Sequence, residues 1–517
     1  MKSLKTIEKR RLECQVELDT AKSKLERNKL GQFATPPILA QELAELASQY
    51  LAQGKSKVRL LEPSVGSGSF ISALFKAFPL KNVEAVKGVE YDKRFADFAS
   101  SLWQDFQQVQ IISGDFTSQK QKEGEDYNLL IANPPYVRHH HLSRDVKARL
   151  KEAVRNELGI EVSGLAGLYS YFLLLSHKWL SDDGLSFWLI PSEFMDVNYG
   201  RAVKDYLLNN VELLRIHRFD PSEVQFTDAL VSSAVVIFRK RKPPTIKPVE
   251  FSYGGSLLKP SSRKEVSAQE LADSNKWTPL ANDCEHPSKT SSLKLGDLFD
   301  VKRGIATGNN SFFILPRSQV EEFEIPSGFV RSYVPSPRYL KDSIIESDSE
   351  GFAKTEKDLI VIDCPEGEDF LRNNYPKFWN YLEEGQNQGV DSTYLTSRRT
   401  PWYSQEKRPA APFLCSYMGR NPKKPFRFFW NKSQAIASNV YLLIYPKGDL
   451  LERINENPSL EGKVFNELEA ISPEDFRREG RVYGGGLRKM EPKELKNLPA
   501  DRIAEIAGVS TQGELKF

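Results

Sequence analysis

The chain has 517 residues, with 72 Lys and Arg, 69 Asp and Glu and a formal net charge of +3. At about 150 residues per domain, this length predicts two to four domains. A content of 40% hydrophobic and 27% charged residues excludes a chain that is disordered throughout, and no apolar stretch is long enough for a membrane helix. The charged opening residues and four widely spaced cysteines lead us to expect no secretory signal, no disulfide framework, no metal site and a cytoplasmic location.

Residues 1–30 are rich in Lys, Arg and Glu with Leu at intervals, which predicts an N-terminal amphipathic helix that packs on the following domain. Short apolar segments then alternate with helical stretches as far as residue 239. We expect strands at 58–62, 84–90, 109–115, 127–133, 185–190, 213–218 and 231–239. This repetition is typical of an α/β domain in which helices cover both faces of a parallel sheet.

A charged segment with prolines at 240–250 predicts the end of this domain. The residues that follow are polar, and a second folded region with weaker periodicity starts near Leu295. We therefore expect an N-terminal helix, an α/β domain, a linker and a C-terminal domain of mixed α and β structure, at residues 1–30, 31–243, 244–294 and 295–517.

A glycine-rich motif, EPSVGSGSF at 62–70, lies between a predicted strand and a predicted helix. Gly66 and Gly68 allow a tight turn that a ligand can approach closely, and Glu90 at the end of the next strand can accept hydrogen bonds from a ribose diol. Together they indicate a nucleoside cofactor, although the turn alone is equally typical of an ordinary tight turn. Glu62, just before the glycines, suits a cationic group such as an α-amine better than a pyrophosphate.

Two residues follow the third predicted strand. Asp115 can hold an adenine amine while Phe116 covers the adenine ring. Asp115 is also explained as a helix cap without any ligand.

The decisive motif is Asn-Pro-Pro-Tyr at 133–136, after the fourth predicted strand. Asn133 offers an amide oxygen and Pro134 a backbone carbonyl, and successive prolines make the loop rigid. Two fixed acceptors can bind both hydrogens of one amino group and localise the nitrogen lone pair for attack. Tyr136 offers a ring face on which the base carrying that amine can stack.

These motifs, in this order, resemble those of the adenine-specific DNA methyltransferases that use S-adenosylmethionine, and specifically the gamma-type enzymes of restriction–modification systems. The residues GQFATPP at 31–37 match the opening segment of that pattern. The resemblance implies a Rossmann-like methyltransferase domain with a doubly wound, mostly parallel seven-stranded sheet, followed by a target-recognition domain. The cofactor-binding residues that it implies are Thr35, Glu62, Ser64, Gly66, Gly68, Glu90, Asp115, Phe116, Pro135 and Phe172.

Two aromatic residues carry over from the family with an open alternative. Phe172 matches the residue that packs on the cofactor adenine, and Phe226 matches the residue that stacks on the target base. Phe172 is equally explained as a core aromatic, and the alternative for Phe226 is a place at the edge of the core. The expected catalytic residues are Asn133, Pro134 and Tyr136.

Charge in the second region is segregated, with acidic residues concentrated at 341–391 and basic residues, interleaved with aromatics, at 398–432. Gly-rich loops at 303–314 and 483–490 resemble the edges of the family's recognition domain. A basic and aromatic stretch is typical of a nucleic-acid face, or of a solvated basic edge above an aromatic core. The DNA-binding residues expected here are Arg303, Arg399, Arg420, Lys423, Lys424, Arg427 and Arg488.

The resemblance implies methyl transfer from S-adenosylmethionine to the N6 amine of an adenine flipped out of double-stranded DNA, in a monomer that protects host DNA from a cognate endonuclease. We expect no membrane partner. His139, His140 and His141 are expected in a loop near DNA phosphate, because adjacent histidines do not readily share one metal ion. The alternatives are methylation of RNA adenine or protein glutamine, and a non-catalytic DNA-binding specificity protein.

Overall fold

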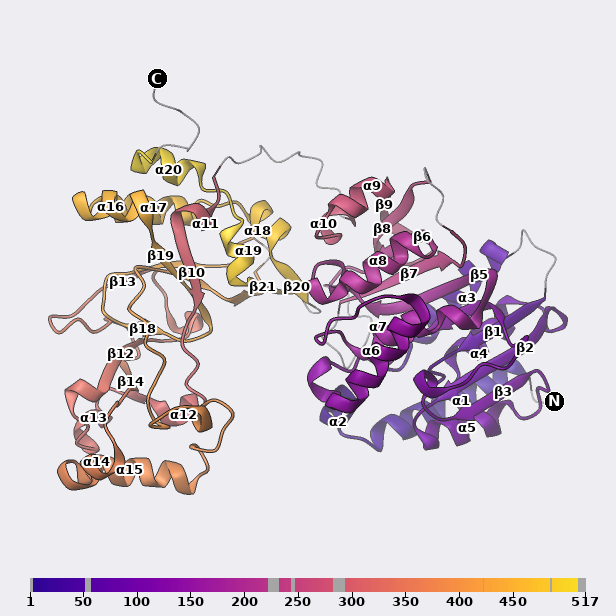
Figure 1. Ribbon diagram of the computed structural model, residues 1–517, viewed down its shortest axis with the longest axis horizontal. Helices are drawn as coiled ribbons and strands as arrows, with labels where there is room; N and C mark the ends of the chain where they lie inside the picture. Colours follow the sequence, from indigo (N-terminus) through magenta and orange to yellow (C-terminus); the bar gives the residue numbers. More distant parts are fainter. Residues whose placement is uncertain are drawn as a thin grey trace. The chain divides into compact units, whose positions relative to one another are not determined.

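The computed structural model describes residues 3–51, 57–221, 232–242, 247–281, 293–421, 423–483 and 486–509. The chain divides into two compact units (Figure 1). The first is Met1–Glu285 with Tyr483–Gly485, and the second is His286–Val482 with Gly486–Phe517. None of the described helices is both long and apolar enough to cross a membrane.

The first unit is built on one mixed sheet with the strand order β3-β2-β1-β4-β5-β7-β6-β8-β9. Strands β3 to β5 of that order are parallel, and β7 runs antiparallel between β5 and β6. The strands are β1 (Val58–Glu62), β2 (Val83–Glu90), β3 (Val109–Ser113), β4 (Tyr127–Ala132), β5 (Leu180–Pro191), β6 (Glu212–Arg218), β7 (Ser233–Arg239), β8 (Val249–Gly255) and β9 (Pro260–Val266). The α/β prediction is confirmed, but the sheet has nine strands instead of seven.

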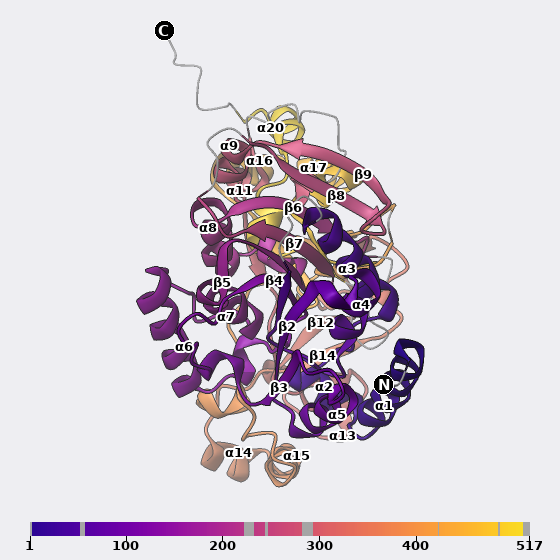
Figure 2. The ribbon, with the colours of Figure 1, turned by 90° about the vertical axis from the view of Figure 1, so that its right-hand side faces the viewer.

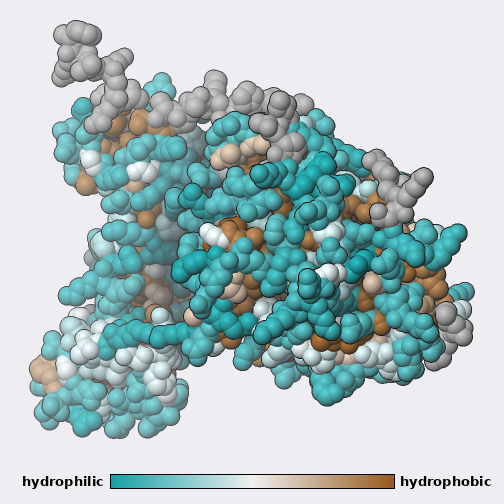
Figure 3. Space-filling view, turned by 45° about the vertical axis from the view of Figure 1, so that its right-hand side comes forward, coloured by the Kyte–Doolittle hydropathy of each residue, from teal (hydrophilic) through white to brown (hydrophobic). Residues whose placement is uncertain are grey.

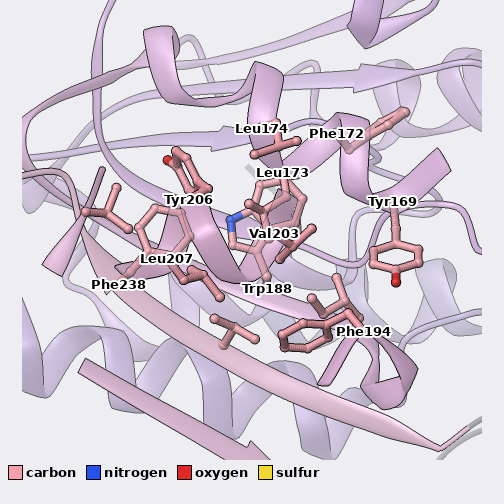
Figure 4. Packing of buried hydrophobic residues seen from close by; sticks show 14 of the residues in the cluster. Tyr169, Phe172, Leu173, Leu174, Trp188, Phe194, Val203, Tyr206, Leu207 and Phe238 are labelled. Carbon is pink, nitrogen blue, oxygen red and sulfur yellow. The ribbon is translucent and has the colours of Figure 1, made fainter. Parts of the chain in front are cut away.

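Helices cover both faces of this sheet, as the alternation of strand residues requires. Along β5, Phe187 and Leu189 enter one hydrophobic core while Trp188 and Ile190 enter the other. Figure 4 shows Trp188 surrounded by side chains of α7 and α8. The main helices are α3 (Pro37–Leu51), α4 (Ser69–Ala77), α5 (Lys93–Trp103), α6 (Arg144–Leu158), α7 (Leu168–Leu175) and α8 (Arg201–Asn209).

The N-terminal segment forms two helices instead of the single one expected, α1 (Leu4–Thr20) and α2 (Lys24–Leu30). Ser23 separates them by a capping box. Its hydroxyl accepts a hydrogen bond from the amide of Glu26, and its amide donates one to the carboxylate of Glu26. Helix α1 packs against α4 and α5 (Figure 2) and buries Ile7, Arg11 and Cys14.

The α/β domain extends beyond the boundary expected at residue 243. Strands β8 and β9 continue its sheet, and α9 (Ala268–Asp273) and α10 (Thr278–Ala281) follow within the segment 244–294 that was expected as a linker. Buried Trp277 ties this segment to the unit, because its amide donates to the carbonyl of Met195.

The second unit has mixed α and β structure, as expected, in sheets of order β10-β19-β15-β17-β13, β11-β14-β12-β18 and β16-β21-β20. Its strands are β10 (Phe299–Arg303), β11 (Ile314–Pro316), β12 (Val330–Val334), β13 (Ile344–Ile345), β14 (Leu359–Ile362), β15 (Phe413–Ser416), β16 (Met418–Gly419), β17 (Phe428–Asn431), β18 (Ile436–Ala437), β19 (Tyr441–Pro446), β20 (Arg481–Tyr483) and β21 (Leu487–Lys489). Its helices are α11 (Leu295–Leu298), α12 (Asn310–Phe313), α13 (Gln319–Glu322), α14 (Glu368–Asn374), α15 (Pro376–Asn387), α16 (Gly448–Glu456), α17 (Leu460–Glu469), α18 (Pro473–Glu479), α19 (Pro492–Lys496) and α20 (Asp501–Ala507).

Hydrophilic side chains cover most of the face drawn in Figure 3, and hydrophobic ones appear there in small separate groups. Scattered apolar groups of this kind are normal for a folded surface and mark no docking site by themselves.

Candidate active site

Three loops meet at the carboxyl ends of the neighbouring parallel strands β1 and β4. The Ser64 hydroxyl of the glycine loop donates to the carbonyl of Asn133 at 2.9 Å, and the Ser69 hydroxyl donates to the carbonyl of Thr35 at 3.2 Å. The amide of Tyr136 donates to the carbonyl of Gly31 at 3.0 Å. The opening segment, the glycine loop and the Asn-Pro-Pro-Tyr loop thus form one hydrogen-bonded assembly.

Gly31 is required by this assembly. Its φ of +62° is in the left-handed region, and an added Cβ would lie 2.4 Å from the backbone nitrogen of Tyr136. The glycine therefore permits the close approach of two loops that are about 100 residues apart in the chain.

The glycine loop is held by the carboxylate at the end of β2. Glu90 accepts hydrogen bonds from the amides of Gly66 and Asp92, both at 2.8 Å. Burial raises the pKa of Glu90, while these amides act in the opposite direction. Gly68 begins α4 with a φ of +85°, and a Cβ there would meet the indole nitrogen of Trp103 at 2.7 Å.

A cavity of about 390 Å³ opens at these loops. It brings together residues from the ends of four strands and from several helices. The predicted site residues that line it are Thr35, Ser64, Gly66, Glu90, Asp115, Phe116, Asn133, Pro135 and Phe172. Four others lie next to the wall in sequence without forming part of it: Glu62, Gly68, Pro134 and Tyr136.

The amide of Asn133 has a defined orientation. Its Nδ2 donates to the carbonyl of Phe33 and to the hydroxyl of Thr35, each at 3.1 Å. Within the described residues no donor contacts Oδ1, which remains as an acceptor at the cavity wall. This hydrogen-bond network assigns the oxygen and nitrogen of the amide.

Tyr136 is 7% exposed, and its ring lies beside that of Phe33 with centroids 5.7 Å apart. Its hydroxyl donates to the carbonyl of Leu189 at 3.2 Å, and burial raises its pKa. The open ring face expected for base stacking is therefore not seen in the described residues, and Tyr136 as a stacking residue stays a prediction. Phe226, its expected partner, lies outside the described residues.

Asp115 is a helix cap that also lines the cavity, and its contact with an adenine amine stays a prediction. It caps the short helix η2 (Phe116–Ser118), because its carboxylate accepts from the amide of Thr117 at 2.9 Å, and it also lines the cavity. Arg149 of α6 donates to the same carboxylate at 3.0 Å. Phe116 and Phe172 lie with ring centroids 5.4 Å apart in the adjoining wall.

Glu62 lies behind the glycine loop, 1% exposed, and its Oε2 has no hydrogen-bond partner among the described residues. Burial raises the pKa of Glu62 well above its ordinary value; the nearby Glu90 raises it further and Arg11 lowers it. A buried carboxylate with an unpaired oxygen is stabilised when a hydrogen-bond donor or a positive charge is placed next to it.

Several wall residues were missed by the sequence reasoning. Gln15 and Asp19 come from α1, Tyr91 follows Glu90, and Arg149 comes from α6. The signal for Gln15 and Asp19 was their spacing of four residues, which places them on one face of a helix. That spacing alone is equally typical of a solvated face, so only the fold reveals their place.

The three histidines form the short helix η3 (His139–His141), and His141 lines the cavity. Burial and the neighbouring His140 lower the pKa of His139 and of His141. Among the residues that the structure describes, no group of three His, Cys, Asp or Glu is arranged to hold a metal ion.

The basic and aromatic stretch of the second unit is mostly core. The aromatic residues that are buried there are Trp402, Tyr403, Phe413, Tyr417, Phe426, Phe428 and Phe429. Of the two alternatives left open, these aromatic residues therefore fit the aromatic core. Phe413, Phe428 and Phe429 belong to β15 and β17, and Trp402 and Tyr403 belong to a separate hydrophobic cluster.

Two of the expected DNA-binding cations hold loops of this unit. Arg399 donates to the carbonyls of Ala306 and Thr307, and Arg427 donates to those of Pro337 and Leu340. Burial lowers the pKa of Arg399. Both guanidinium groups therefore have structural partners.

The other expected cations are placed differently. Lys424 pairs with Glu469 at 2.9 Å, and Arg303 lies over the ring of Tyr417 at 4.3 Å. Arg488 belongs to β21, which pairs with β16. Arg420 and Lys423 are exposed in the turn that follows β16.

Comparison with known proteins identifies the family. A family model described as Eco57I restriction-modification methylase matches residues 7–226, and one described as the C-terminal domain of the Type II methyltransferase M.Eco57I matches residues 282–515. The Type II methyltransferase M.AccI of Acinetobacter calcoaceticus is 28% identical over 497 residues, which are 93% of this chain and 87% of that protein. M.XamI of Xanthomonas campestris pv. amaranthicola is 28% identical over 478 residues, 90% of this chain and 84% of that protein.

Among solved structures, the Type IIL restriction-modification enzyme MmeI in complex with DNA is similar with a TM-score of 0.51 and 11% sequence identity. The similarity covers 82% of this chain and 61% of that chain, so the present chain corresponds to part of the MmeI length and shares its fold. The two family models match successive parts of the chain, one in the first structural unit and one mainly in the second, and the chain belongs to the Eco57I-type restriction–modification methylases.

Proposed function

We propose that the protein is a site-specific DNA methyltransferase that transfers a methyl group from S-adenosylmethionine to the N6 amine of an adenine in double-stranded DNA. The observation that carries the proposal is the orientation of Asn133. Phe33 and Thr35 hold its Nδ2, which leaves Oδ1 as the acceptor atom of a residue that lines the cavity beside the rigid proline loop. An oxygen fixed in this way is suited to one hydrogen of an incoming amino group.

The residues of the cavity fit S-adenosylmethionine. Its volume is in the range of small-molecule sites, and its wall contains the carboxylates of Asp19, Glu90 and Asp115 as well as the guanidinium of Arg149. This excess of negative charge suits a ligand that carries a sulfonium and an ammonium group. Phe116 and Phe172 offer rings for the adenine, and Glu90 lies where a ribose would be held.

When bound, S-adenosylmethionine supplies a methyl group on a positively charged sulfur. The residues of the chain then contribute by positioning the target amine. Asn133 Oδ1 and the carbonyl of Pro134 accept the two hydrogens of the target amine, which localises its lone pair and directs it at the methyl carbon. The target base must leave the double helix to arrive there, at a cost of a few kcal/mol that stacking on Tyr136 and Phe226 would offset. The proton lost by the amine leaves after transfer.

The second unit is proposed to bind the DNA. The relatives are Type II methyltransferases, and the MmeI structure with the same fold is described as a complex with DNA. Exposed cations on Arg420 and Lys423, together with Arg303 and Arg488, offer contacts to the phosphate backbone. We propose that the protein acts as a monomer and protects host DNA from a partner endonuclease with the same recognition site.

The test is incubation of the purified protein with tritiated S-adenosylmethionine and mixed genomic DNA, followed by nucleoside analysis. We expect label in N6-methyladenine and in no other nucleoside. Label in cytosine would contradict the assigned base, and label only in RNA or in protein glutamine would contradict the assigned substrate. An Asn133→Ala protein, treated in parallel, should bind the cofactor without labelling DNA.

A further inference from the structure

The N-terminal helix α1 forms part of the candidate cofactor site. Gln15 and Asp19 line the cavity, and Arg11 precedes Gln15 by the same spacing of four, so the three side chains lie on one face of the helix. Gln15 donates to Asp19 at 2.8 Å along that face. The face of α1 that meets the cavity is therefore polar, and Arg11 is its most buried member.

Arg11 links α1 to the glycine loop. It is 1% exposed, and its Nη1 donates to the hydroxyl of Ser67 at 2.9 Å. Its Nε and Nη2 donate to the two carboxylate oxygens of Glu8 at 2.8 and 2.9 Å, which fixes the guanidinium plane. Glu8 in turn accepts from the hydroxyl of Ser72 in α4 at 2.6 Å. A buried guanidinium that donates through Nε, Nη1 and Nη2 is fixed in place, and it fixes the hydroxyl of Ser67 with it.

The same guanidinium acts on Glu62, whose Oε2 is buried without a partner in the described part of the chain. The charged groups that act on Glu62 are Glu90 from β2, which opposes its ionisation, and Arg11 from α1, which favours it. Behind Arg11 stand Glu8 and, 3.6 Å from Glu8, the ammonium of Lys76. Among these, Arg11 is the cation that favours the charged form of Glu62.

We propose that Arg11 is a positioning residue of the cofactor site: from α1 it holds in place Ser67 of the glycine loop, which lines the cavity. Its positive charge also favours the ionised form of Glu62, the form that suits a cationic cofactor. The inference rests on the proposed use of S-adenosylmethionine. On this proposal, α1 contributes to cofactor binding as well as covering the sheet.

The test is the dissociation constant of S-adenosylmethionine, measured by calorimetry across pH 6 to 9, for the full chain and for Arg11→Met. We expect binding by Arg11→Met to be weaker by about tenfold near neutral pH and to recover as pH rises, because loss of the cation moves the ionisation of Glu62 to higher pH. Arg11→Lys, which retains the charge, should restore the pH profile. Arg10→Met, which removes the same charge from an exposed position of α1, should bind as the unmodified protein does.

A neutral ligand separates charge from loop geometry. 5′-Methylthioadenosine lacks the sulfonium and the ammonium, so its binding by Arg11→Met should not recover with pH. If both ligands lose affinity equally and at every pH, Arg11 acts through the loop alone, and its electrostatic role at Glu62 is overturned. Unchanged binding of S-adenosylmethionine by Arg11→Met would overturn it as well.

A second variant covers the case in which Arg11→Met does not fold. Ser67→Ala removes only the bond on the loop side, so it should weaken cofactor binding without a change in its pH profile, and unchanged affinity would contradict the positioning role. If the unmodified protein binds no S-adenosylmethionine, the proposed function fails and this inference fails with it. If it binds and the variants bind equally well, only the inference fails.

Discussion

At the scale of single residues, the site depends on a few hydrogen bonds that orient one amide. Asn133 is held by a backbone carbonyl and by the hydroxyl of Thr35, which belongs to a segment that precedes it by about 100 residues. An oriented acceptor requires no reorganisation when the substrate arrives, and this is the larger part of the gain from preorganised polar groups.

Asn133→Ala should reduce methyl transfer by at least about 100-fold, because the developing charge on the target amine loses its oriented acceptor. Cofactor affinity should stay the same, since the remainder of the cavity wall is unchanged. Single-turnover transfer and equilibrium binding are the two measurements. Asn209→Ala, on the exposed end of α8, is the matched control. Transfer at the unmodified rate would remove Asn133 from the mechanism.

Thr35→Val should lower the rate of transfer by about fivefold to tenfold, the loss expected for one hydrogen bond, because Nδ2 of Asn133 loses a partner. Thr35→Ser retains the hydroxyl and should keep the rate. The family resemblance assigns Thr35 to cofactor binding instead. A variant that weakens cofactor binding at an unchanged single-turnover rate would favour that assignment over the positioning of Asn133.

The residues that sequence reasoning found are those whose chemistry is constrained by the backbone. Glycines at positive φ and successive prolines leave a local pattern, and the structure places Gly66, Gly68 and Asn133 at or beside one cavity. Tyr136 was expected with an open ring, but burial depends on side chains from distant segments. Arg11 gave no local sign, because a helix of mixed charge does not show which of its cations is buried.

At the scale of elements, loops that approach closely depend on glycine for reasons of space as well as conformation. Gly31 and Gly124 have similar positive φ angles, at +62° and +72°, but only Gly31 of the two has backbone atoms where a Cβ would be. Substitutions at these two glycines therefore distinguish the cost of backbone strain from the cost of a steric clash.

Gly124→Ala should cost about 1–2 kcal/mol of unfolding free energy, the penalty of a left-handed alanine. Gly31→Ala should cost clearly more and should also impair methyl transfer, because the 2.4 Å approach forces the opening segment away from the Asn-Pro-Pro-Tyr loop. Denaturant unfolding of the two variants measures the difference. Equal losses would show that the opening segment moves without effect on the site.

The strands β8 and β9 explain why the boundary at residue 243 was placed too early. The sequence of β9, PSSRKEV, contains one apolar residue that is buried, and its side chains alternate between partly buried and exposed positions at the edge of the sheet. An edge strand with one solvated face carries little apolar signal, so it resembles a polar linker. In the second unit the sequence left a nucleic-acid face and an aromatic core as alternatives, because the aromatic residues of the core strands have many cations as neighbours in the sequence.

The turn after β16 is the element of the second unit where DNA binding is most directly testable. Arg420→Ala with Lys423→Ala should weaken DNA binding and lower the slope of log affinity against log salt by about 0.9 for each phosphate that the protein no longer neutralises. Lys463→Ala, an exposed cation on α17, should leave the slope unchanged. A double variant with the unmodified slope would exclude this turn from the interface.

At the scale of the whole molecule, each of the large hydrophobic cores lies within one of the two units. The clusters around Trp188 and Phe187 belong to the first unit, and those around Phe413 and Phe378 belong to the second. Because the cofactor cavity is lined by residues of the first unit, a ligand there stabilises that unit directly.

Calorimetric unfolding should therefore show two transitions, of which S-adenosylmethionine raises one. At a concentration 100 times its dissociation constant the expected stabilisation is about 2.7 kcal/mol. The transition that does not shift is the internal control, so the experiment does not require a truncated protein without residues 295–517. One transition that moves as a whole would show that the two units unfold together.

The walls of the cavity extend along the chain from Gln15 to Phe172, and the last strand of its parallel sheet, β5, ends at Pro191. During synthesis α1 leaves the ribosome before any of the elements on which it packs. It therefore has no packing contacts until those elements have been synthesised. Contacts of such long sequence separation also form slowly once the segments are present. A nascent chain is therefore unable to bind a ligand in this cavity until the residues as far as β5 have emerged.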